Sequence, residues 1–226
     1  MNSISWKNNL FWDMGVIIEK TPTITKAKKR IKQYTIPGRN GVLNVDEGTY
    51  EPFPLTLECH YRESVDKDTI NAWLDGYGNL SLDGIREYKG IVSNAIPFEK
   101  VQDFKRFQVQ FMLNPISKKI IPTTETIDIT QSSTSINVLG NTNTYPKITI
   151  NVSGTATIDI NNQTFTIVDG DGEYILDCEA KEILKNGVNA SKNMSGYFPY
   201  LSPGENQIDM TGTLTSLTIE YNEAYL

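Results

Sequence analysis

The sequence has a single histidine, His60, and two cysteines, Cys59 and Cys178. A zinc site that uses several histidines is therefore excluded, and two distant cysteines cannot form a structural zinc site by themselves. No Gly-x-Ser-x-Gly turn, phosphate-binding loop or dinucleotide-binding motif accompanies His60. We therefore expect no catalytic centre, no metal site and no cofactor.

Long apolar runs are also missing: none approaches the ~20 residues of a membrane span. The first residues show no basic segment followed by an apolar one, so we expect no signal peptide and synthesis in a cytoplasm. Each cysteine lies in a strand-like run, which predicts two buried thiols and no disulfide.

The net charge of −6 is the wrong sign for a protein whose main partner is nucleic acid. One basic run, Lys26–Lys32, occurs in this otherwise acidic chain. It could bind an anionic surface, but we interpret it as a strand or arm whose cations pair with acidic neighbours.

The chain has few alanines and many Thr, Ile, Asn and Tyr residues, a composition that favours strands and turns. One helix is predicted, with Asp66 as its N-cap, Ile70, Trp73 and Leu74 on its apolar stripe, and Gly76 after its end. Apolar residues alternate with polar ones in two strands of the first half, at 55–61 and 107–113. The second strand is expected to end at Asn114–Pro115, because proline cannot donate a ladder hydrogen bond.

Helix signals disappear in the stretch 121–135, and we place the domain boundary there, with domains at 1–125 and 126–226. Beyond it, alternating runs at 148–152, 158–167 and 217–221 predict strands. Turns are expected at Asn161–Asn162, Asp169–Gly172 and Asn186–Gly187. Strands at ~8–12-residue spacing indicate a β-sandwich or a barrel, and we interpret the second half as a β-sandwich. The fold class is thus mainly β, with one short helix in the N-terminal domain.

The segment Ile36–Gly41 predicts a rigid, sharply bent connection, since Pro37 fixes one corner while Gly38 and Gly41 permit positive φ. Arg39 would project from its apex, where a planar guanidinium suits an interface. The candidate interface residues are Pro37, Gly38, Arg39, Asn40 and Gly41.

The order of these features resembles the distal tail protein family of siphophages, the tail component of phages and prophages of Gram-positive bacteria. The matching runs, each weak alone, are Phe11–Trp12, Ile36–Gly41, Val65–Leu80, Tyr88–Ser93, Phe104–Pro115, Tyr145–Ile150, Ile158–Asn162 and Tyr197–Asn206.

The resemblance implies a structural, non-enzymatic protein of the phage tail tip, or baseplate, in the virion. Six copies would form a ring through N-terminal belt domains, and galectin-like C-terminal sandwiches would project outward. The ring would join the tail tube protein to the tail-associated hub or fibre protein. DNA would pass through its lumen without specific binding, and no membrane would be involved.

An alternative is a receptor-binding or carbohydrate-binding module of the tail, with Tyr197, Phe198 and Tyr200 as a stacking platform. We favour core and domain packing for these aromatics, because Pro199 and Pro203 interrupt a flat surface. The family likeness does not imply lectin activity, since fold is not function.

Overall fold

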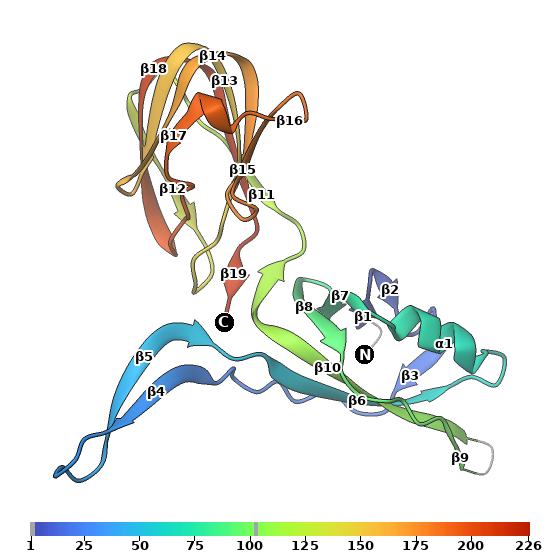
Figure 1. Ribbon diagram of the computed structural model, residues 1–226. Coiled ribbons are helices and arrows are strands. Elements are labelled where there is room, and N and C mark those ends of the chain that lie inside the picture. The colour runs from blue at the N-terminus through green and yellow to red at the C-terminus, as the bar shows by residue number, and fades with distance from the viewer. Residues whose placement is uncertain (1–2, 102–103) are drawn as a thin grey trace. The chain divides into compact units, whose positions relative to one another are not determined.

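The computed structural model describes residues 3–101 and 104–226. It divides into two compact units, one formed by residues 1–117 with Leu226 and the other by Lys118–Tyr225 (Figure 1). In the described residues, no helix is long and apolar enough to cross a membrane.

The first unit contains a mainly antiparallel sheet, one helix and a separate hairpin. The sheet order is β2-β1-β7-β8-β10-β6-β3, with β9 paired to β10. These strands are β1 (Ser5–Trp6), β2 (Asn9–Leu10), β3 (Val16–Ile18), β6 (Phe53–Tyr61), β7 (Tyr77–Ser81), β8 (Arg86–Val92), β9 (Glu99–Val101) and β10 (Phe104–Lys119). The hairpin consists of β4 (Lys29–Thr35) and β5 (Val42–Tyr50), which form a two-stranded sheet of their own.

Strands β6 and β10 form the centre of the first core. They pair from Tyr61 with Lys105 to Phe53 with Leu113, and alternate residues of both strands are buried. The two predicted strands are thereby confirmed. The helix α1 (Lys67–Leu74) is confirmed as well and buries Ile70, Trp73 and Leu74 in the same core. Asp66 occupies the N-cap position, but its side chain makes no capping hydrogen bond.

The prediction that the second strand ends at Asn114–Pro115 was wrong, because β10 continues to Lys119. The register with β6 stops at Leu113. Pro115 therefore lies beyond that ladder, where its missing N–H breaks no hydrogen bond to β6.

The second unit is a β-sandwich. Its strand order is β11-β18-β13-β14-β15-β16, with β12 also paired to β18 and β17 to β14. The strands are β11 (Thr123–Thr126), β12 (Ser133–Val138), β13 (Lys147–Ile160), β14 (Gln163–Asp177), β15 (Glu182–Lys185), β16 (Val188–Asn189), β17 (Met194–Gly196), β18 (Gly204–Tyr221) and β19 (Ala224–Tyr225), and a 3-10 turn spans Ser191–Asn193.

Three long strands, β13, β14 and β18, supply both layers of the sandwich. The β13 register shifts between Gly154 and Ala156, so each long strand bends near its middle. One half of β18 pairs with β11 and the other with β12, and the halves of β14 likewise pair with β15 and β17. The buried aliphatic residues between these halves form the second core.

The prediction of a separate turn at Asp169–Gly172 was wrong. These residues lie inside β14, opposite the bend of β13, with Gly170 facing Gly154. A Cβ atom on Gly170 would lie 2.5 Å from Cγ2 of Val152, so the two strands approach too closely for a larger residue. The turns at Asn161–Asn162 and Asn186–Gly187 are confirmed, and both have positive φ at their two central residues, as tight hairpins require.

Replacement of Ile158 by alanine should lower the free energy of unfolding of the second unit by about 2–5 kcal/mol, because the fully buried side chain leaves a cavity. All three tryptophans lie in the first unit, so their fluorescence transition should stay in place while the far-ultraviolet circular dichroism transition shifts. The control Val168→Ala, at a side chain 40% exposed, should cost less than about 0.5 kcal/mol. Equal effects of the two substitutions would contradict the assigned core.

Candidate functional site

The predicted interface loop forms the tip of the β4–β5 hairpin. The backbone N–H of Arg39 donates to the carbonyl of Ile36 at 3.1 Å, which closes a four-residue turn with Pro37 and Gly38 at its corners. Gly38 and Gly41 have φ of 79° and 85°, values that favour glycine. All five candidate residues are exposed. The structure therefore places them together at the end of a projecting ribbon (Figure 1).

The hairpin carries apolar side chains that its own fold leaves in solvent. Six large ones are each 39–51% exposed: Ile31, Tyr34, Ile36, Val42, Leu43 and Val45. The register places Tyr34 beside Leu43 on one face and Val42 beside Thr35 on the other. Because successive side chains of a strand point to opposite faces, both faces of the ribbon are partly apolar.

Neither strand of the hairpin has a second strand partner among the described residues. An isolated two-stranded hairpin is marginally stable in water, and its free edges are templates for pairing. Scattered exposed apolar residues are ordinary on a protein surface, but a cluster of them on one ribbon is typical of interaction surfaces. Sequence reasoning found the tip and interpreted the basic run as a strand or arm. It missed the exposed apolar side chains of the hairpin, because burial cannot be read from a short apolar alternation.

Cross-strand ion pairs hold the base of the hairpin. Nζ of Lys28 lies 3.5 Å from Oε2 of Glu51, and Nζ of Lys32 lies 2.8 Å from Oε1 of Glu47. Lys29 forms an ion pair with Asp46. The hydrogen bond from Lys29 lowers the pKa of Asp46, with a smaller contribution from the Gly48 N–H. The interpretation of the basic run as a strand with acidic neighbours is thus confirmed.

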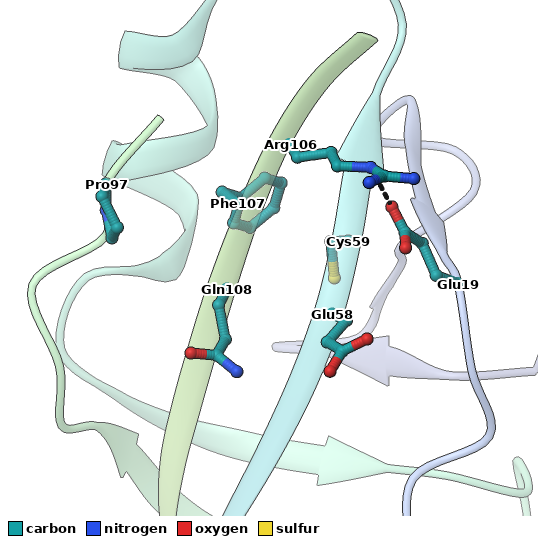
Figure 2. A pocket seen from close by; sticks show the side chains of 7 residues that line it. All are labelled: Glu19, Glu58, Cys59, Pro97, Arg106, Phe107 and Gln108. Carbon is teal, nitrogen blue, oxygen red and sulfur yellow. Dashed lines mark ion pairs between the residues drawn. The ribbon is translucent and has the colours of Figure 1, made fainter. Parts of the chain in front are cut away.

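A pocket of about 330 Å³ opens beside β6 and β10, and its lining includes Glu19, Cys59 and Arg106 (Figure 2). Arg106 Nε lies 2.9 Å from Oε1 of Glu19, and Nδ1 of His60 lies 3.6 Å from the same oxygen. This carboxylate oxygen is buried, and its contact with Arg106 lacks the alignment of a hydrogen bond. Arg106 neutralises the charge, so the geometry is that of a structural ion pair.

The thiols in this fold are poor nucleophiles. Cys59 and Cys178 are free and buried, as predicted. Burial raises the pKa of each thiol to about 12, well above the range in which a thiolate forms at neutral pH. Among the residues that the structure describes, no group of three or more His, Cys, Asp or Glu side chains could hold a metal ion.

The aromatic platform of the alternative interpretation is only partly present, and the favoured packing role holds for Phe198. Phe198 packs against the core of the second unit and Pro199 is buried, whereas Tyr197 is 72% exposed. The ring of Tyr200 lies 6.4 Å from that of Tyr145, which the sequence had not suggested as its neighbour. Tyr197, Phe198 and Tyr200 therefore do not form one continuous platform.

Comparison with known proteins identifies a family and a similar fold. The family model for the siphovirus-type tail component, C-terminal domain, matches residues 110–225. The crystal structure of the SPP1 Dit protein, described as a paradigm of the hub adsorption apparatus in phages that infect Gram-positive bacteria, superposes with a TM-score of 0.79. The sequence identity is 14%, and the alignment covers 99% of each chain, so this likeness shows a shared fold. No curated protein sequence matches this chain.

The raised thiol pKa values predict a decline of stability at high pH. The unfolded thiols ionise near their ordinary pKa of 9.0, whereas the folded thiols stay protonated to about 12, so the free energy of unfolding should fall as pH rises between these values. Urea denaturation of the native protein and of the double variant Cys59→Ala, Cys178→Ala should show a steeper fall for the native protein. Parallel curves would contradict the buried, protonated state of these thiols.

Proposed function

Because the chain belongs to the siphovirus-type tail component family, we propose that it is the subunit of a hexameric ring at the tip of a phage tail. The ring joins the tail tube protein to the tail-associated hub or fibre protein, and DNA passes through its lumen without specific binding. The description of the similar SPP1 Dit protein as part of a hub adsorption apparatus supports this placement in the virion.

The observation that carries the proposal is the β4–β5 hairpin. Its strands have free edges, and apolar side chains such as Tyr34 and Val42 are exposed on opposite faces. A surface of this kind is stabilised when a neighbour covers it. A cyclic ring requires a head-to-tail contact between two different surfaces, and a projecting ribbon that lies against the next copy provides one such surface.

The loop Pro37–Gly41, at the tip of the hairpin, is proposed to contact the neighbouring copy as well. Its turn is fixed by Pro37 and by glycines with positive φ, so little conformational entropy is lost on binding. The exposed Arg39 can form a bidentate contact with a carboxylate or with carbonyls of the neighbouring copy.

The two units have different proposed tasks. The first, predicted to span residues 1–125, forms the ring, because the hairpin belongs to it. The second, predicted at 126–226, is a galectin-like sandwich that projects outward. The absence of enzymatic activity is part of the proposal and is supported by the family's structural role in the tail and by the arginine-neutralised Glu19 and protonated Cys59 in the described pocket.

Light scattering of the purified protein should give the mass of six 25.4 kDa chains, and negative-stain images should show rings. A ring that closes only on the tail is tested by mixing the protein with tail tubes that lack it, which should then acquire a terminal ring. A monomer that adds no ring to tubes and binds host cell wall polysaccharide would replace this proposal by the carbohydrate-binding alternative.

Replacement of Arg39 by alanine should raise the dissociation constant of ring assembly about tenfold, because an interface arginine loses its contacts. The melting temperature should stay nearly unchanged, since the side chain is exposed at a hairpin tip. The matched control is Lys192→Ala, an exposed cation of the second unit, which should assemble as the native protein does. Normal assembly of the Arg39 variant, or its unfolding, would refute the role of the loop.

A further inference from the structure

The sequence contains the dipeptide Asn-Gly twice, in nearly the same local setting. Arg39–Val42 and Lys185–Val188 both consist of a basic residue, asparagine, glycine and valine, in that order. An asparagine side chain is short enough to reach the next backbone nitrogen, and a following glycine has no Cβ atom to obstruct that approach. Because the neighbours match, any difference in reactivity between the two asparagines must come from the folded structure.

Asn186 and Gly187 are the two central residues of a tight hairpin turn in the second unit. Lys185 pairs with Val188 directly across this turn, and φ is 51° at Asn186 and 74° at Gly187. A two-residue turn with positive φ at both positions also fixes ψ of its first residue, and that ψ directs the next backbone nitrogen away from the side chain. The nitrogen of Gly187 can therefore reach Cγ of Asn186 only after the end of the hairpin opens.

Asn40 and Gly41 lie in a longer connection at the tip of the β4–β5 hairpin. The hydrogen bond from the N–H of Arg39 to the carbonyl of Ile36 closes a turn that ends before Asn40. Among the described residues, no hydrogen bond holds the side chain of Asn40 or the N–H of Gly41. Both residues are exposed, and a Cβ atom on Gly41 would meet nothing within 4 Å. This backbone can rotate without breaking a strand pair.

We propose that Asn40 is a site of spontaneous deamidation. The backbone nitrogen of Gly41 attacks Cγ of Asn40 and loses its proton as the new C–N bond forms, while the side-chain amide nitrogen leaves as ammonia. Water then opens the resulting five-membered imide at either carbonyl, which gives aspartate or isoaspartate. One ammonia is released and one water is consumed, so the reaction needs no oxidant, reductant or enzyme. The attacking groups are adjacent in the chain, which makes the step intramolecular.

The modification changes the charge of the hairpin tip. Arg39 is the one charged residue in the segment 36–41, and deamidation places a carboxylate directly after it. The cation of the loop is then neutralised by its own neighbour. Isoaspartate also brings Cβ of this residue into the main chain and lengthens the loop. The proposal goes beyond the ring function and does not depend on it.

Incubation of the full native chain in mildly alkaline buffer, followed by digestion after glutamate and mass spectrometry, tests this site. The peptides 20–47 and 183–205 report on Asn40 and Asn186 separately. Deamidation at Asn40 should be about tenfold faster than at Asn186, because only the second requires local opening of a paired hairpin. In water labelled with a heavy oxygen isotope, the new carboxyl group should carry the label. In urea, the two rates should agree within about twofold, since the local sequences match.

Two controls lie in the same peptide. The variant Asn40→Gln should lose the rapid mass gain, because the longer side chain cannot form the five-membered ring. Asn44 should stay unmodified in the native chain, because Val45 follows it and its Oδ1 accepts a hydrogen bond from Nε2 of Gln33 at 3.0 Å. Equal rates at Asn40 and Asn186 in the folded chain would overturn the proposal. A tenfold difference that persists in urea would also overturn it, because the fold would then not be the cause.

Discussion

The alternation of buried and exposed side chains along each strand is the constraint on which both units depend. A strand turns successive residues to opposite faces, so one face can be apolar only if it lies on a core. Strands β6 and β10 obey this rule in the first unit, and β13, β14 and β18 obey it in the second. A shift of register by one residue would move Val109 or Ile158 into solvent, which explains why both cores specify a single pairing.

The β4–β5 hairpin departs from this rule, and the departure gives the molecule its proposed task. No core among the described residues covers its apolar side chains, and three exposed ion pairs connect its two strands near the base. Exposed ion pairs of this kind contribute little stability each, so the hairpin gains most when a neighbour buries it. A ribbon that is ordered in advance loses less entropy on assembly than a disordered arm.

Much of this fold could be predicted from local patterns. Ile70, Trp73 and Leu74 show a helical stripe, and Asn161–Asn162 indicates a tight turn, because these signals depend on neighbouring residues alone. The predictions at Pro115 and Asp169–Gly172 were wrong, because the structure there depends on strands distant in the sequence. The pairing of β10 with β6 ends before Pro115, and Gly154 of β13 lies opposite Gly170. The loop Pro37–Gly41 was recognisable from its turn chemistry. The exposure of Tyr34 and Leu43 was not, because it depends on whether a third strand pairs with the hairpin, and none of the described strands does.

The most direct measurement is a cryo-electron microscopy map of the tail tip of a particle that carries this protein. The account predicts one ring of six copies around the tail axis, with each β4–β5 hairpin buried against the next copy and Arg39 at the contact. A map in which the copies lie singly outside the axis, or in which the hairpins of the ring stand free in solvent, would contradict it.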